Sequence, residues 1–243
     1  MKAMILAAGL GTRLRPLTDR LPKPLLPVSG RPLIEWTLLL LRRYGVRDVI
    51  INLHHLGHLI EQALGDGSAF AMRIAYSREP VLLGTGGGLK QAEPFFSGEP
   101  FLVVNGDTLF DLDLTAMAAA HREGRSIATM ALRADPEPER WGAVEVDAEH
   151  HVLRINGRGR DGGGRTSKRM FAGVHLMHPR LLADVPVGRD SSVIEAYVRA
   201  IQGGETVGGY EWSGYWSDIG TPERYEQARR DAEAGVIDLA SRE

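Results

Sequence analysis

Residues 5–27 read ILAAGLGTRLRPLTDRLPKPLLP, a short apolar run that enters a glycine turn and continues into a basic, proline-rich segment. We expect Gly9 and Gly11 to let the backbone turn with a positive φ, so that consecutive N–H groups can point at phosphate oxygens. Arg13 and Lys23 add positive charge to the same segment. The stretch therefore predicts an anion-binding turn at the end of a buried strand.

Two better-known phosphate loops do not fit this stretch. A dinucleotide fingerprint needs G-x-G-x-x-G opening directly into a helix, whereas Arg13 and Leu14 follow the second glycine here. A P-loop needs G-x-x-x-x-G-K-[ST], which the sequence does not contain. Four prolines follow, Pro16, Pro22, Pro24 and Pro27. Each removes a backbone donor and restricts the backbone of the residue before it. We therefore expect a stiff, extended loop over the carboxyl end of the first strand.

The composition is that of a compact globular enzyme. The 243 residues are 43% hydrophobic and 25% charged, with a formal net charge of −2, which argues against disorder and against a nucleic-acid surface. The apolar run at residues 3–10 is too short for a signal peptide, and no stretch reaches membrane-span length. We therefore expect a cytoplasmic protein with no membrane partner. The chain has no cysteine, so any metal must bind oxygen or imidazole.

Hydrophobic patterning predicts alternating strands and helices in the first half of the chain. Expected strands cover 2–7, 48–53, 73–76 and 101–104, and expected helices cover 32–44, 58–64 and 88–92. Apolar strands separated by helices imply an α/β fold, with a mostly parallel central sheet covered by helices on both faces. Ligands then bind at the carboxyl ends of the strands.

The pattern changes after an expected helix at 114–123. Expected strands cover 126–132, 143–146, 151–155 and 170–177, and two further helices are expected at 191–201 and 222–234. The glycine-rich run at 157–164 is too polar to pack, so we interpret it as a mobile loop or hairpin tip beside the site. The second half of the chain is therefore expected to be β-rich.

The run at 5–27 resembles the signature of the sugar-1-phosphate nucleotidylyltransferases, (L)AAG-x-G-T-R-L-x-P-L-T…P-K-P. The resemblance implies a Rossmann-like GT-A-type fold with a small β-rich sugar-binding part. It covers residues 1–234 as one nucleotidyltransferase domain and stops before the β-helix that some relatives append. It implies a nucleotide-binding half at 1–123, a sugar-binding half at 124–234 and a tail at 235–243.

The same resemblance implies where the nucleotide binds. In the family the glycine loop wraps the triphosphate, the arginine matching Arg13 binds its phosphates, and the lysine matching Lys23 contacts the reacting phosphates. The LGTGGGL segment at 83–89 resembles a family segment that lines the base and ribose; a simple helix-start turn is the alternative interpretation. The implied nucleotide-binding residues are Leu6, Ala8, Gly9, Gly11, Thr12, Arg13, Lys23, Thr85, Gly86, Asn105 and Gly106.

Two aspartates are candidates for a metal site. Asp107 comes directly after an apolar strand, and Asp218 comes just before an expected helix. Mg²⁺ is commonly held by one or two carboxylates plus substrate phosphates, although a turn residue and a helix cap are equally good interpretations of each aspartate alone. The family's N-G-D and W-x-D-I/V-G-T motifs supply both Mg²⁺ ligands, and both motifs are present here. The resemblance thus implies Mg²⁺ on Asp107 and Asp218, and a catalytic set of Arg13, Lys23, Asp107 and Asp218.

Two further segments contain the candidates for binding the sugar phosphate. The segment RWGAV at 140–144 resembles a family strand that borders the sugar, although a merely packed Trp141 is the alternative. Many relatives carry F-x-E-K-P, whose lysine binds the sugar phosphate, but Arg158 stands at that lysine here, and Lys168 is a second candidate. A solvated loop arginine is the alternative for Arg158. The implied sugar-phosphate residues are Asn105, Trp141, Gly142, Arg158 and Lys168.

The implied reaction needs no general base. A sugar 1-phosphate, with a second pKa of about 6 like that of a phosphorylated side chain, is largely dianionic at neutral pH. We therefore expect in-line attack on the α-phosphorus of a nucleoside triphosphate, with pyrophosphate leaving and Mg²⁺ neutralising charge. The expected partners are a nucleoside triphosphate and a sugar 1-phosphate; the oligomeric state is not readable from the sequence.

The substrate pair stays open. The T-G-G-G segment and the missing E-K-P are similar to relatives that use UTP with N-acetylmuramate 1-phosphate, whereas RWGAVEV is more similar to those that use GTP with mannose 1-phosphate. A CTP-dependent cytidylyltransferase for an alcohol phosphate such as phosphocholine is the nearest other enzyme. A non-catalytic nucleotide-sensing subunit is the alternative from a different class, although Lys23, Asp107 and Asp218 are all present.

Overall fold

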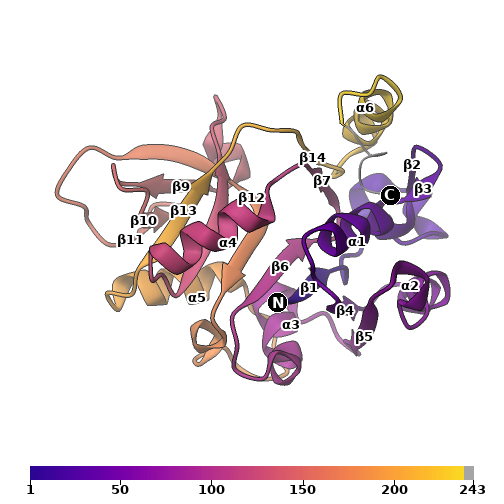
Figure 1. Ribbon diagram of the computed structural model, residues 1–243, viewed down its shortest axis with the longest axis horizontal. Helices are drawn as coiled ribbons and strands as arrows, with labels where there is room; N and C mark the ends of the chain where they lie inside the picture. Colours follow the sequence, from indigo (N-terminus) through magenta and orange to yellow (C-terminus); the bar gives the residue numbers. More distant parts are fainter. Residues whose placement is uncertain (238–243) are drawn as a thin grey trace. The chain divides into compact units, whose positions relative to one another are not determined.

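A computed structural model of the chain describes residues 1–237 and divides them into two compact units. The first unit contains Met1–Leu82, Val104–Leu112 and the chain from Gly214 onward, and the second contains Leu83–Val103 and Asp113–Ser213. The first unit is therefore assembled from three segments that are far apart in the sequence, which Figure 1 shows by their colours. Of the tail expected at 235–243, residues 238–243 lie outside the described residues.

The first unit is built around three parallel strands. β1 (Lys2–Leu6) pairs with β4 (Asp48–Leu53), which pairs with β5 (Arg73–Arg78). The apolar residues of β1 and β4 are almost fully buried, as expected for strands without polar alternation. The helices of this part are α1 (Leu33–Arg43) and α2 (Gly57–Leu64). The expected α/β class is thereby confirmed (Figure 1).

Two short ribbons and a helix complete the first unit. β7 (Thr108–Phe110) pairs antiparallel with β14 (Trp216–Asp218), and β2 (Pro27–Val28) pairs with β3 (Arg31–Pro32). Patterning did not predict any of these strands, because each contains only two or three residues. α6 (Pro222–Glu233) starts where Thr221-Pro222-Glu223 predicts it, with the Thr221 side chain accepting a hydrogen bond from Arg224 N.

The second unit contains the expected β-rich part. Its strands are β8 (Ala128–Arg133), β9 (Ala143–Val146), β10 (Val152–Ile155), β11 (Arg158–Gly159), β12 (Ser167–Met177) and β13 (Val207–Glu211). β12 runs antiparallel between β8 and β9, β10 pairs antiparallel with β9 and β11, and β13 pairs parallel with β8. The glycine-rich run begins in the turn that joins β10 to β11, includes β11 itself and continues into the connection to β12, so the expected hairpin tip is confirmed only for Gly157.

The helices of the second unit are α3 (Gly84–Ala92), α4 (Leu114–Glu123) and α5 (Val193–Gln202). The side chains of Asp113 and Ser192 accept hydrogen bonds from backbone N–H groups in the first turns of α4 and α5, which fixes where these two helices begin. β6 (Phe101–Asn105) contains the boundary between the units. Among residues 1–237, none of the helices is both long enough and apolar enough to cross a bilayer.

Short 3₁₀ turns occupy several of the connections. They are η1 (Thr12–Leu14), η2 (Leu17–Asp19), η3 (Lys23–Leu25) and η4 (Ser68–Phe70) in the first unit, and η5 (Glu93–Phe96), η6 (Pro138–Trp141) and η7 (Pro179–Leu182) in the second. Three of them lie within the proline-rich segment that follows the glycine turn. Two of these three turns, η1 and η3, contain the candidate site residues Thr12, Arg13 and Lys23.

Candidate active site

The glycine turn begins directly after β1 and is tied to the neighbouring strand. Ala7 N donates a 2.8 Å hydrogen bond to Oδ1 of Asn52, a buried residue of β4. Gly11 has a φ of +63°, and a Cβ there would lie 2.9 Å from Cγ2 of Thr18. The expected positive φ is thus confirmed for Gly11 and wrong for Gly9, which is absent from the glycines with positive φ. No atom lies within 4 Å of a Cβ built on Gly9, so the backbone there is open to close approach by a ligand.

The basic segment after the turn is coiled rather than extended. η1, η2 and η3 follow one another between residues 12 and 25, so the expectation of a continuous extended loop is wrong. Proline is compatible with these turns because its fixed φ suits a 3₁₀ helix and its missing donor is not needed in the first turn. The carbonyl of Pro22 accepts a 2.8 Å hydrogen bond from Leu25 N, which fixes the backbone around Lys23.

The remaining residues expected to meet the phosphates lie on this same stretch of the first unit. Leu6 ends β1, Ala8 is buried, Thr12 begins η1, and the side chain of Arg13 is exposed. Lys23 lies in η3 and is only 8% exposed. A nearly buried ammonium requires anionic partners, which two distant segments of the chain supply.

The pairing of β7 with β14 brings Asp107 and Asp218 together. Asp218 is the register partner of Thr108, and Ile219 N donates a 3.0 Å hydrogen bond to the carbonyl of Asp107. Gly106 lies against the end of β1: its N–H donates to the Leu6 carbonyl at 2.9 Å, and a Cβ would lie 2.8 Å from that oxygen. The glycine of the N-G-D motif is therefore required by backbone packing, with Asn105 at the end of β6 beside it.

Lys23 lies between the two aspartates. Its Nζ is 2.6 Å from Oδ2 of Asp107 and 3.7 Å from Oδ1 of Asp218. The other oxygen of Asp218, Oδ2, accepts a 2.7 Å hydrogen bond from Nη1 of Arg224. The sequence-predicted catalytic residues Lys23, Asp107 and Asp218 thus form one cluster, which we call the acid–lysine cluster.

Burial makes the charge of Asp218 costly. Desolvation raises the pKa of Asp218 above its usual value, and the negative charge of Asp107 raises it further. The positive charges of Lys23, Arg224 and Arg13 oppose this rise in pKa. Arg13 reaches the cluster from η1, since a Cβ on Gly220 would lie 3.2 Å from its Nη2 and 2.8 Å from Oδ2 of Asp218. The cluster therefore favours positive charge near Asp218.

The donor set of the acid–lysine cluster fits a hard divalent cation. Its ligating atoms are carboxylate oxygens, and Asp107 and Asp218 keep 37% and 17% of their side-chain surface accessible. Within residues 1–237, no group of three or more His, Cys, Asp or Glu side chains is arranged to hold a metal ion. Two protein carboxylates leave coordination positions for phosphate oxygens and water, which is the usual arrangement for Mg²⁺.

Sequence reasoning missed Arg224. A cation in the first turn of a helix is opposed by the positive end of the helix dipole, so Arg224 near the start of α6 needs an acidic partner. This mismatch could have identified Arg224 from the sequence, but Asp218 was interpreted only as a metal ligand or a helix cap and not as the partner of an arginine.

Asn52 was missed as well. It is a buried amide at the end of an apolar strand, and it links Ala7 to the buried carboxylate of Glu79, with 2.8 Å from Asn52 Nδ2 to Glu79 Oε1.

In the second unit, Thr85 and Gly86 lie at the start of α3 and contact α5 and the segment before it. Thr85 Oγ1 accepts a 2.9 Å hydrogen bond from Val193 N, the first residue of α5. Gly86 N donates to the Ser191 carbonyl at 2.7 Å, and a Cβ on Gly86 would lie 2.9 Å from the Ser192 carbonyl carbon. Thr85 and Gly86 therefore have a packing role that their expected contact with a nucleotide base does not include.

The remaining sugar-phosphate candidates lie on η6, β11 and β12 of the second unit. Trp141 ends η6, and Gly142 follows it with a φ of +83°. Exposed Arg158 forms an ion pair with Glu195, with Nη1 2.5 Å from Oε1, which raises the pKa of Arg158. Lys168 Nζ lies 2.7 Å from Oε1 of Glu139, which raises the pKa of Lys168. Glu139, the partner of Lys168, lies in η6 together with Trp141.

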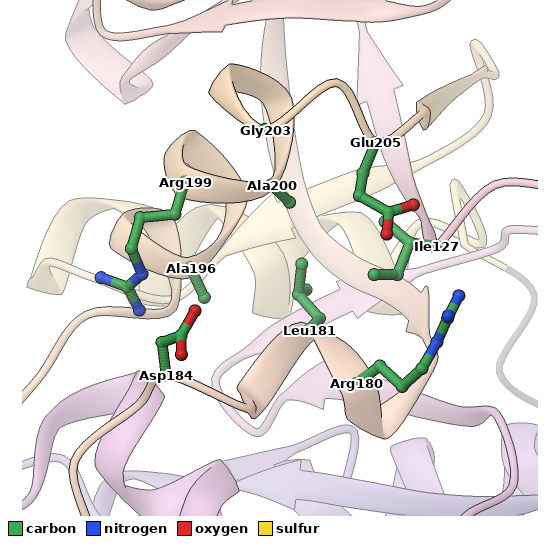
Figure 2. Close-up of a pocket in the computed structure, with 9 residues that line it drawn as sticks. All are labelled: Ile127, Arg180, Leu181, Asp184, Ala196, Arg199, Ala200, Gly203 and Glu205. Atoms are coloured by element: carbon green, nitrogen blue, oxygen red, sulfur yellow. The ribbon is translucent and has the colours of Figure 1, made fainter.

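A cavity in the second unit contains none of the predicted site residues. Its volume is about 220 Å³. Figure 2 shows Arg180 and Asp184 along one side of the cavity, and Arg199 of α5 and Glu205 of the loop after α5 along the other. The remaining lining residues are Ile127, Leu181, Ala196, Ala200 and Gly203. Because its two arginines are balanced by two acids, its charge favours neither anions nor cations.

Comparisons with known proteins match nearly the whole chain, including segments of both units. The family model described as nucleotidyl transferase matches residues 2–235. A protein of Neisseria meningitidis named N-acetylmuramate alpha-1-phosphate uridylyltransferase is 41% identical over 233 residues, which is 94% of this chain and 97% of that protein. A Mycobacterium tuberculosis protein named mannose-1-phosphate guanylyltransferase is 32% identical over 96% of this chain, which spans 65% of that protein's length.

Solved structures share the fold over almost the whole chain. The crystal structure of HddC from Yersinia pseudotuberculosis complexed with GMP-PN has a TM-score of 0.78 and 25% identity, covering 95% of this chain and 99% of that one. A Bacillus anthracis protein crystallised with sucrose has a TM-score of 0.84 at 24% identity, covering 98% and 96%. The Rossmann-like architecture expected from the sequence is therefore confirmed.

Proposed function

The chain belongs to the nucleotidyl transferase family and is a nucleotidyltransferase that acts on sugar 1-phosphates with a nucleoside triphosphate; from that premise, we propose that its substrates are UTP and N-acetylmuramate 1-phosphate. The observation that carries the substrate pair is the 41% identity to the Neisseria protein across 97% of that protein's length. GTP with mannose 1-phosphate is the second candidate, favoured by the Mycobacterium relative at 32% identity.

We assign the chemistry to the acid–lysine cluster and Arg13. Lys23 and Arg13 bind the triphosphate oxygens and neutralise the charge that develops on them, which is the main contribution a protein makes to phosphoryl chemistry. Asp107 and Asp218 would hold Mg²⁺, which supplies further charge neutralisation at the phosphates when it is bound. Gly9 and Gly11 let backbone N–H groups approach the phosphates.

The remaining assignments follow the family resemblance. Thr85 and Gly86, with Leu6, Ala8, Thr12, Asn105 and Gly106, would line the nucleotide. Asn105, Trp141 and Gly142, with Arg158 or Lys168, would bind the sugar phosphate. The attacking phosphate oxygen is already ionised near neutral pH, so no side chain has to remove a proton from it.

Pyrophosphate release measures this proposal directly. The purified protein is mixed with Mg²⁺ and each combination of UTP, GTP or CTP with N-acetylmuramate 1-phosphate, mannose 1-phosphate, glucose 1-phosphate or phosphocholine. We expect the highest kcat/KM for UTP with N-acetylmuramate 1-phosphate. A preference for GTP with mannose 1-phosphate supports the second candidate, and turnover of CTP with phosphocholine supports a cytidylyltransferase. Nucleotide binding without turnover in any mixture would contradict catalysis altogether.

A further inference from the structure

The backbone of Lys23 is fixed by a short turn and the residue is nearly buried. Its backbone lies in η3 between Pro22 and Pro24, and only 8% of the residue is exposed. Hydrogen bonds from Leu25 N to the Pro22 carbonyl and from Leu26 N to the Lys23 carbonyl, at 2.8 and 3.1 Å, close the turn on both sides. The backbone is therefore fixed, and only the side chain can move from one anionic partner to another.

The side-chain ammonium lies where the charges of the two aspartates converge. Nζ is 2.6 Å from Oδ2 of Asp107 and 3.7 Å from Oδ1 of Asp218. Arg224 already binds the opposite oxygen of Asp218, at 2.7 Å from Oδ2. The oxygen of Asp218 that remains for a metal is thus the one that faces Lys23.

A divalent cation on these same carboxylate oxygens would meet the ammonium of Lys23 at close range. The two cations repel each other, and the repulsion is strong because the site is mostly shielded from water. A triphosphate changes this balance, because its oxygens are another anionic partner for the ammonium of Lys23. The lysine side chain is flexible, and its three N–H donors can turn toward the phosphates. Movement of Nζ onto the phosphates would free Asp107 and Asp218.

We infer that Lys23 is a resident counter-ion that occupies the metal position of the acid–lysine cluster until a triphosphate draws its ammonium away. This inference rests on the proposed function, because it takes Asp107 and Asp218 as the metal ligands. Metal and triphosphate then bind cooperatively, and by linkage each raises the affinity for the other by the same factor. The site stays neutralised when empty and binds metal weakly without substrate.

Binding of Mn²⁺ alone tests the inference without any turnover. Free Mn²⁺ is followed by electron paramagnetic resonance during titration of the nucleotide-free protein. We expect Lys23→Met to bind Mn²⁺ at least tenfold more tightly than the wild type, and Lys23→Arg, which keeps the charge, to bind as weakly as the wild type. Lys90→Met is the matched control, because it removes a lysine that pairs with Glu93 in the second unit, 2.7 Å away. It should leave Mn²⁺ affinity unchanged.

A second substitution assigns the gain to the cluster. Adding Asp107→Asn to Lys23→Met should abolish the tighter Mn²⁺ binding. Lys23→Gln replaces the methionine variant if circular dichroism shows that the latter does not fold. Equal Mn²⁺ affinity in wild type and the folded neutral variant would overturn the inference, while pyrophosphate release by the wild type would still support the proposed function. Tighter binding without any pyrophosphate release would uphold the counter-ion role and contradict the function.

Discussion

In the first unit Lys23, Asp107 and Asp218 bind one another, whereas in the second Arg158 and Lys168 each bind a glutamate that no motif marks. Lys23, Asp107 and Asp218 neutralise each other in one cluster. Arg158 and Lys168, in contrast, form exposed ion pairs with two different glutamates, Glu195 and Glu139. Mutual pairing of buried charges is a stronger indication of a site than an exposed ion pair. A buried charge is costly unless the fold provides a partner of opposite charge for it.

The same contrast holds for glycines. In the first unit Gly220 lies against Asp218 and two arginines, so its missing side chain leaves room for the cluster. In the second unit Gly87 lies against the backbone of Arg189, where a Cβ would be 2.4 Å from the carbonyl oxygen. One glycine thus makes space for charged groups, and the other allows α3 to pack. Substitution at each position can separate the two roles.

The largest expected effect comes from Asp107→Asn, which removes one charge from the acid–lysine cluster. Turnover should fall by about 10²–10³-fold, because the variant loses a carboxylate that would hold Mg²⁺ at the phosphates. The protein should still fold, since Asp107 retains 37% side-chain exposure and asparagine keeps its size. Pyrophosphate release and a thermal unfolding curve measure both effects. Asp113→Asn is the matched control, as asparagine caps α4 equally well; near wild-type turnover in Asp107→Asn would refute the metal assignment.

Gly220→Ala should lower turnover by about tenfold, because the added methyl displaces the carboxylate of Asp218, and misplacing a group at a site by about 1 Å can cost up to about 10²-fold in rate. The added methyl would lie 2.8 Å from Oδ2 of Asp218 and 3.2 Å from Nη1 of Arg224, so the carboxylate has to move off the arginine. Gly163→Ala provides the control, since nothing lies within 4 Å of a Cβ there. Equal turnover in both variants would show that the orientation of Asp218 does not matter.

Gly87→Ala should act on stability rather than on nucleotide binding. A Cβ would lie 2.4 Å from the Arg189 carbonyl oxygen and 3.0 Å from Cβ of Leu83, so α3 must shift, at a cost of about 1–3 kcal/mol. Urea unfolding measures this loss, and the KM for the triphosphate measures the alternative role. An unchanged unfolding free energy with a raised KM would mean that this glycine faces the nucleotide, and the contrast between the two units would then disappear.

Local signals in the sequence were sufficient for the individual elements. β4 at 48–53 and α4 at 114–123 were predicted with their observed bounds, because apolar runs and caps act within a few residues. Family motifs placed Asp107 and Asp218 without showing how they meet. That information lies in β14, whose three residues pair with β7 across a long stretch of chain. No pattern of three residues can specify such a partner.

Glycines in the LGTGGG segment show the other limit. The sequence requires only that the backbone be approached closely, and both a flat base and a packed helix meet that requirement. The contacts of Gly86 with Ser191 and Ser192 became visible only when α5 was placed beside α3. Likewise, Arg158 and Lys168 were identified by their charge alone, and charge does not tell a substrate ligand from a surface ion pair.

The smallest expected effect, and the one that decides the role of the second unit, comes from Arg158→Gln compared with Glu195→Gln. Both substitutions break the same exposed ion pair, so both should leave the midpoint of thermal unfolding nearly unchanged. If Arg158 binds the sugar phosphate, its loss raises the KM for that substrate about tenfold, in the range of one charge-assisted hydrogen bond, whereas Glu195→Gln leaves the arginine in place and does not raise it. The pair Lys168→Gln and Glu139→Gln tests the second candidate in the same way. A raised KM in neither arginine nor lysine variant would leave both cations as surface ion pairs and place sugar-phosphate binding on other residues.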